Sequence, residues 1–251
     1  MTGLKRKIDL YFFRKSQMIS RKVAKNINRG VTRCPPEYEY KWQNIIKTMQ
    51  FNSKITPEEL NDLEYVGFAG EIYIIEDNGE EYSNAIKYLK NQTVLGFDTE
   101  TRPCFSSGQP RYKVSLLQLS GGNRAYLFRV QLLEDLNELY DILADENILK
   151  IGAAVNDDIR GLQKHLKFSA KSFVDLQKIV WEWGIKDKSV KKMAAIILGY
   201  KISKGQQLSN WEADYLSDSQ AQYAATDAWV CREMYIKLLN SEKNPIDFSV
   251  E

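Results

Sequence analysis

The segment 93–101 constrains the fold most strongly, because a short apolar run ends there in two carboxylates. Its sequence is Thr-Val-Leu-Gly-Phe-Asp-Thr-Glu-Thr. Large apolar and β-branched residues in a run of this length are typical of a buried strand. Alternate side chains of a strand point to the same face, so Asp98 and Glu100 are expected side by side. We therefore predict a sheet whose central strand, 93–97, ends in an acidic pair.

Short strands and helices alternate along most of the chain and predict a mixed α/β domain. Further strands are expected at 71–75, 113–119, 125–130 and 148–154, with 113–119 and 125–130 joined as a hairpin by Gly121-Gly122-Asn123. Helices are expected at 82–89, 135–143, 156–166, 176–183, 190–198 and 217–239. Asn156 is the expected cap of the helix 156–166, and Thr56 caps a short helix that starts at Pro57.

Composition is that of an ordinary folded protein. The chain has 251 residues, of which 43% are hydrophobic and 27% charged, so it is long enough to bury a core. Its three cysteines have no CxxC spacing, which argues against a disulfide framework or a zinc knuckle and favours a reducing, cytoplasmic compartment. No apolar run is long enough to span a bilayer, so we expect no membrane partner.

Positive charge is concentrated at the N-terminus. Residues 1–35 contain ten Lys or Arg and one acid, Asp9, although the whole chain carries only +2. We divide the chain into a basic extension, 1–55, for which disorder is one reading, and a folded domain, 56–251. The extension is open to three interpretations: a nucleic-acid clamp, an organellar transit peptide, or residues absent from the mature protein because translation starts at Met49.

Two more acidic positions lie at the ends of predicted elements. Asp157 and Asp158 open the helix 156–166, where the helix dipole explains one carboxylate but not obviously two. Tyr223 and Asp227 are four residues apart, one turn of the helix 217–239. Each feature alone is common, and a solvated strand end would explain the pair at 98 and 100. Paired carboxylates in a core, however, repel one another, and a divalent cation is their natural compensation.

Three segments together resemble a known family. Phe97-Asp98-Thr99-Glu100, Gly152-x5-Asp158-x3-Leu162 and Tyr223-x3-Asp227 resemble the three motifs of the DEDD exonuclease superfamily, in its tyrosine-bearing branch. The segments 114–119 and 208–211 also look familial, and the resemblance, which covers about 56–239, is closest to compact Werner-type exonucleases. Ala154 departs from the polymerase-type pattern, which has Asn there. Alignment to Leu162 selects Asp158 over Asp157.

The resemblance implies an α/β fold of the ribonuclease H-like class, a mixed sheet flanked by helices with the acids at one edge. It implies a hydrolase that cleaves phosphodiester bonds as a 3′-5′ exonuclease by a two-metal mechanism. Two Mg²⁺ or Mn²⁺ ions would be held by Asp98, Glu100, Asp158 and Asp227, while Tyr223 would orient the attacking water. Oxygen ligands suit these hard cations, and the single histidine, His165, argues against a histidine-based site.

The implied partner is the 3′ end of a nucleic acid. Thr101 and Lys204 are candidate substrate contacts, although Lys204 is read equally well as an ordinary loop lysine. Further candidates to line the groove are Arg102, Arg111 and Lys113, whereas Trp211 is expected in the core. No helical RNA-binding domain follows Leu239, which inclines the prediction towards DNA. The alternatives are ribonuclease D-like RNA trimming and an inactive nucleic-acid-binding protein, which the five filled motif positions disfavour.

Overall fold

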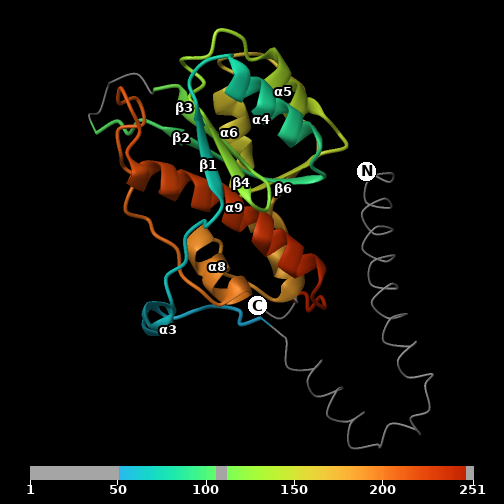
Figure 1. The fold of residues 1–251 in the computed structure, drawn as a ribbon. Helices are drawn as coiled ribbons and strands as arrows, with labels where there is room; N and C mark the ends of the chain where they lie inside the picture. Colours follow the sequence, from blue (N-terminus) through green and yellow to red (C-terminus); the bar gives the residue numbers. More distant parts are fainter. Residues whose placement is uncertain (1–50, 106–111, 247–251) are drawn as a thin grey trace, which may run out of the picture. The chain divides into compact units, whose positions relative to one another are not determined.

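A six-stranded mixed sheet organises the chain in a computed structural model that describes residues 51–105 and 112–246 (Figure 1). Its strands are β1 (Glu71–Ile75), β2 (Val94–Thr101), β3 (Val114–Ser120), β4 (Arg124–Phe128), β5 (Leu149–Gly152) and β6 (Phe173–Asp175). The strand order is β1-β4-β3-β2-β5-β6. β3 is antiparallel to both β2 and β4, and the other neighbours are parallel. Most of the predicted extension, with Met49, and also Arg111 lie outside the described residues.

Helices cover both faces of this sheet (Figure 1). They are α3 (Pro57–Asp62), α4 (Glu80–Lys90), α5 (Asn137–Ala144), α6 (Val155–Leu162), α7 (Leu176–Ile179), α8 (Val190–Leu198) and α9 (Asp218–Leu239), with a 3₁₀ helix at Val180–Trp183. One buried cluster joins the sheet to α4, α5 and α6. A second joins the opposite face to α9. No helix within the described ranges is long and apolar enough to cross a membrane.

The two faces of β2 have different neighbours. Leu95 and Phe97 pack into the cluster under α4, α5 and α6. Gly96, Asp98 and Glu100 alternate with them and therefore face α9. A Cβ atom built on Gly96 would lie 1.8 Å from the carbonyl oxygen of Ala228 in α9. The absence of a side chain at Gly96 thus allows α9 to cross β2 in contact with its backbone, one residue away from Asp227.

The predicted fold class is confirmed, and several predicted boundaries are corrected. β2 continues to Thr101 instead of ending at 97. The predicted strand 148–154 ends at Gly152, and α6 starts at Val155. Asn156 is therefore inside α6 and is not its cap; the cap position is held by Ala154 in the left-handed conformation, with φ 60°.

The region 173–183 also differs from the expected single helix at 176–183. It forms the short strand β6, then α7, and then a 3₁₀ helix. β6 has only three residues, which is too short to show a period in the sequence. Thr56 caps α3 as predicted and forms a capping box there. Ser217, predicted as the first residue of the helix 217–239, is instead its N-cap and forms a capping box before α9.

Candidate active site

Three carboxylates from two elements converge on the α9 face of the sheet. Asp98 and Glu100 come from β2 and Asp227 from α9, and one oxygen of each lies within 4.8 Å of the others. All three side chains are half-buried. β2 pairs with β5 only as far as Gly96. Asp98 and Glu100 therefore lie on the part of β2 that extends beyond this parallel neighbour.

Asp158 lies beside this group but is not one of its three closest members. It is half-buried in the first turn of α6 and accepts a hydrogen bond of 2.6 Å from the Thr99 hydroxyl. Its charge raises the pKa of both Asp98 and Glu100, which shows that the three carboxyl groups share one electrostatic environment. Asp157 is exposed and pairs with Arg160. The fold thus directs Asp158, and not Asp157, towards the acids of β2.

Tyr223 lies one turn before Asp227 on α9. Its hydroxyl donates a hydrogen bond to the Asp227 carboxylate, which lowers the pKa of that carboxyl group. The Tyr223 side chain is buried, and its ring packs against Trp211 with the ring centroids 6.0 Å apart. Trp211 is only 1% exposed, so it lies in the core as predicted and cannot stack on a nucleobase. It supports the Tyr223 ring instead.

Burial and mutual repulsion strongly raise the pKa values of the carboxyl groups when no cation is bound. Burial, followed by the charges of the neighbouring acids, raises the pKa of Asp98 well above its usual range and that of Glu100 to about 9. Burial also raises the pKa values of Asp158 and Asp227 to about 6. Four carboxylates held this way are stable in ionised form only with a positive charge among them. The donor set fits a hard divalent cation such as Mg²⁺ or Mn²⁺.

The two predicted substrate contacts lie on different segments of the chain. Lys204 is exposed in the segment between α8 and α9, and its charge lowers the pKa of Asp227. Thr101 is the exposed last residue of β2, where the register with β3 shifts after Glu100. The Nε2 atom of His165 lies 2.8 Å from the backbone carbonyl oxygen of Val114, the first residue of β3. This ring nitrogen is therefore hydrogen-bonded to the sheet.

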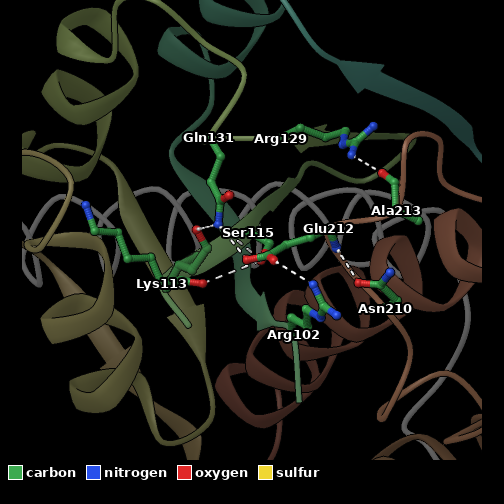
Figure 2. A network of polar contacts seen from close by, with 9 residues as sticks. Arg102, Lys113, Ser115, Arg129, Gln131, Asn210, Glu212 and Ala213 are labelled. Carbon is green, nitrogen blue, oxygen red and sulfur yellow. Dashed lines mark hydrogen bonds and ion pairs between the residues drawn. The ribbon is translucent and has the colours of Figure 1, made fainter. Parts of the chain in front are cut away.

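A polar network fixes residues 212–214, which directly follow Trp211 in the chain (Figure 2). The Glu212 carboxylate accepts hydrogen bonds from Arg102 at 3.4 Å, Ser115 at 3.4 Å and Gln131 at 3.1 Å. The guanidinium of buried Arg129 donates to the carbonyl oxygens of Ala213 and, at 2.7 Å, Asp214. These contacts tie residues 212–214 to the first residues of β3 and to the loop after β4.

Neither this network nor the role of the Thr99 hydroxyl was predicted from the sequence. Glu212 lies 110 residues from Arg102 and 97 from Ser115, so no local period or spacing relates them. Thr99 was included in the first motif, but no role was predicted for its side chain. Its hydrogen bond to Asp158 depends on where α6 begins, which the sequence pattern placed one residue too late.

Comparisons with known proteins agree with this geometry. A family profile described as 3′-5′ exonuclease matches residues 73–242. DNA polymerase I of Aquifex aeolicus (strain VF5) is 30% identical over 161 residues, which are 64% of this chain and 26% of that one. Exonuclease 3′-5′ domain-containing protein 2 of Drosophila melanogaster is 36% identical over 152 residues, 58% of this chain and 25% of that one. The chain thus spans about a quarter of the length of these curated relatives.

Solved structures share the fold. The Aedes aegypti Nibbler EXO domain has a TM-score of 0.61 at 22% identity, covering 70% of this chain and 91% of its own. Escherichia coli RNase D has a TM-score of 0.60 at 21% identity, covering 68% of this chain and 44% of its own. The mixed sheet flanked by helices that the resemblance implied is confirmed by this likeness.

Proposed function

Because the chain belongs to the 3′-5′ exonuclease family, we propose that it removes nucleotides from the 3′ end of a nucleic acid by hydrolysing phosphodiester bonds with two divalent cations, Mg²⁺ or Mn²⁺. The observation that carries the proposal is the convergence of Asp98, Glu100 and Asp227, with Asp158 beside them. The inactive-protein alternative has little support, since each motif position holds a residue able to act.

The four carboxylates would hold the cations. When bound, divalent cations lower the pKa of the attacking water and neutralise charge on the phosphate. Asp98 and Glu100 are fixed by the β2 backbone, and Asp227 by a long helix that contacts β2 at Gly96. Asp158 is held by Thr99 on the same strand. The ligands therefore come from rigid elements, which keeps the reacting groups aligned.

Tyr223 acts by position and not as a base. Burial and the neighbouring Asp227 raise the pKa of its phenol far above neutrality, so the hydroxyl stays protonated. A protonated phenol can donate to one group and accept from another. With its proton directed at Asp227, the Tyr223 oxygen has lone pairs free to accept from the attacking water and to orient it.

Lys204 and Thr101 are proposed to bind the substrate near the scissile bond. The exposed ammonium of Lys204 lies on the Asp227 side of the acids, where it would pair with a phosphate. Arg102 lies over the Tyr112 ring, 4.8 Å from its centroid, and could contact the strand further along. Relatives named as a DNA polymerase and as a ribonuclease D leave both polymers as candidates.

The test is degradation of 5′-labelled single-stranded and double-stranded DNA and RNA by the full-length chain. With Mg²⁺ or Mn²⁺ we expect a ladder of products shortened from the 3′ end, and none with a chelator. Replacing a non-bridging oxygen of the last phosphodiester linkage with sulfur, as a phosphorothioate, should slow the first cut. Internal cleavage, or intact substrate under every metal condition, would contradict the proposed function. The ratio of rates on DNA and RNA decides the preferred polymer.

A further inference from the structure

Gln118 is an unexplained polar residue in the middle of β3. Its side chain is completely buried, with 0% exposure. Neither the nitrogen nor the oxygen of its amide has a hydrogen-bond partner among the residues described. Buried side-chain amides are nearly always bonded, because an amide that leaves water without a partner loses free energy. A leucine at this position would pack in the same core without that loss of free energy. The presence of an amide here therefore requires an explanation other than packing.

The position of Gln118 in the sheet places it next to the acids. It pairs in register with Asp98 on β2 and with Leu127 on β4. Its neighbour two residues earlier, Leu116, packs in the cluster under α9 together with Leu127 and Tyr223. Side chains two apart on a strand share a face, so Gln118 also faces α9, as Asp98 does.

Only one side of Gln118 offers a polar group in the sheet. Leu127 on β4 is apolar and fully buried, whereas Asp98 on β2 is a half-buried carboxylate. Residues directly opposite in an antiparallel pair have Cβ atoms about 4.5–5.5 Å apart. A glutamine side chain can cover that distance by rotating about its own bonds.

We propose that Gln118 is a positioning residue for Asp98: its Nε2–H donates a hydrogen bond to the carboxylate oxygen of Asp98 that does not face the cation. The inference rests on the proposed function, because it assigns the amide to a metal-binding carboxylate. A carboxylate that binds a cation through one oxygen keeps an acceptor on the other. Hydrogen bonds to such ligands fix their orientation and raise metal affinity.

The proposal predicts two effects of opposite sign for Gln118→Met, which keeps an unbranched side chain of similar shape but has no amide. Without cation the variant should melt a few degrees higher than the wild type, because an unpartnered buried amide has been removed. Its dissociation constant for Mn²⁺, measured by calorimetry on the full chain, should rise roughly 10- to 100-fold. If Gln118 only packs, the substitution should change the melting temperature and leave the Mn²⁺ dissociation constant unchanged.

Ser120→Ala is the matched control, because Ser120 is also buried on β3 and faces α9. Its hydroxyl already donates to the Gly121 carbonyl oxygen at 3.0 Å, and its partner on β2 is Gly96 instead of an acid. We expect this variant to melt slightly lower than the wild type and to bind Mn²⁺ with unchanged affinity. Weakened Mn²⁺ binding in Ser120→Ala as large as that in Gln118→Met would overturn the inference, since any disturbance of β3 would then suffice.

A second measurement needs no variant. In the wild-type chain, the side-chain amide resonances of Gln118 should shift and exchange more slowly with solvent when Mg²⁺ is added. Unshifted resonances, or equal Mn²⁺ affinity in Gln118→Met and wild type, would overturn the inference and leave the nuclease proposal intact. A wild-type chain that binds no Mn²⁺ at all would overturn both.

Discussion

Asp98 is the residue on which the proposed chemistry depends most directly. Burial, together with the charges of three neighbouring carboxylates, raises its pKa well above the usual range. Asp98→Asn removes one ligand charge and should lower turnover by on the order of 100- to 10,000-fold, since metal ions contribute several kcal/mol to such reactions. The measurement is the rate of 3′ shortening at saturating Mn²⁺.

Asp157→Asn is the matched control for that substitution. Asp157 is an exposed acid adjacent to Asp158 and pairs only with Arg160 among the described residues. Turnover should remain within a factor of two or so of wild type, because exposed pairs contribute little. A large loss in this variant would mean that Asp157, and not Asp158, supplies the ligand.

Tyr223→Phe separates orientation from metal binding. The phenyl ring keeps the contact with Trp211, and only the hydroxyl that donates to Asp227 is lost. Turnover should fall roughly 10- to 100-fold because the attacking water is less well placed. The Mn²⁺ dissociation constant should change far less. Equal turnover in the two proteins would show that the tyrosine only packs.

The acidic cluster also predicts an unusual pH dependence of stability. Without a cation, burial raises the pKa of Glu100 to about 9 and the pKa values of Asp158 and Asp227 to about 6. In the unfolded chain, carboxyl groups have pKa values near 4. Between about pH 4 and pH 9, therefore, the folded chain binds more protons than the unfolded chain. Stability then falls as pH rises. In a chelator, the melting temperature should decrease from pH 5 to pH 9.

Added Mg²⁺ should reverse that trend, because it binds the ionised carboxylates. The increase in melting temperature on adding Mg²⁺ should therefore be larger at pH 8 than at pH 5. Calorimetry of the full chain at both pH values measures it. An equal increase at the two values would mean that the cation does not bind these carboxylates.

At the scale of elements, the crossing of α9 over β2 brings Asp227 to the acids of β2. Gly96→Ala would place a Cβ atom 1.8 Å from the Ala228 carbonyl oxygen, and backbone cannot yield as a side chain can. We expect a loss of about 1–3 kcal/mol or more in the free energy of unfolding, together with weaker Mn²⁺ binding as Asp227 moves away. Urea denaturation and calorimetry measure the two effects.

Gly122→Ala serves as the comparison for Gly96→Ala. A Cβ atom there would meet only the guanidinium end of Arg232, at 3.5 Å, which is ordinary contact. Stability and Mn²⁺ affinity should both stay near wild type. Equal destabilisation by the two substitutions would show that glycine in general, and not the close crossing of α9, matters.

The elements also show where sequence reasoning succeeds and fails. The helices 190–198 and 217–239 have strong local signals, a serine cap and apolar spacing, and both were predicted to within one residue. α6 was misplaced because its start is set by a distant group: the Asp175 carboxylate accepts from the backbone N–H of Ala154 at 3.1 Å. Such a contact over 21 residues has no signature in the local pattern.

At the scale of the whole molecule, the order of the motifs was enough to name the acids but not to place them. Asp98 and Asp227 are far apart in the chain, and only the sheet order and the path of α9 bring them together. The resemblance therefore named candidate acids, and the fold brings three of them, Asp98, Glu100 and Asp227, close together. Gln118 and Glu212 acquire their significance from cross-strand and loop contacts that exist only in the folded chain.

Charge is divided unevenly over the whole chain, and this bears on how it would hold nucleic acid. Residues 1–35 carry ten basic residues and one acidic residue, so the remaining 216 residues carry 25 basic and 32 acidic ones. An acidic domain has few cations for phosphate contacts, and affinity would then depend on the extension if it acts as a clamp. The extension would add affinity that is independent of sequence and sensitive to salt.

The prediction is tested in the full chain by replacing four basic residues, Arg14, Lys15, Arg21 and Lys22, with serine. Binding to single-stranded DNA is followed by fluorescence anisotropy in Ca²⁺, over a range of salt concentrations. Each phosphate contact on a single strand contributes about 0.7 to the slope of log affinity against log salt. A clamp loses up to four such contacts, so the slope should become shallower by as much as about 3. Turnover on a dinucleotide should not change, because its single phosphodiester is the bond that the active site cleaves and no further phosphate is left to pair with the extension. A slope equal to that of the wild type would remove the clamp interpretation and leave the transit-peptide and alternative-start interpretations, which the mass of the native N-terminus separates.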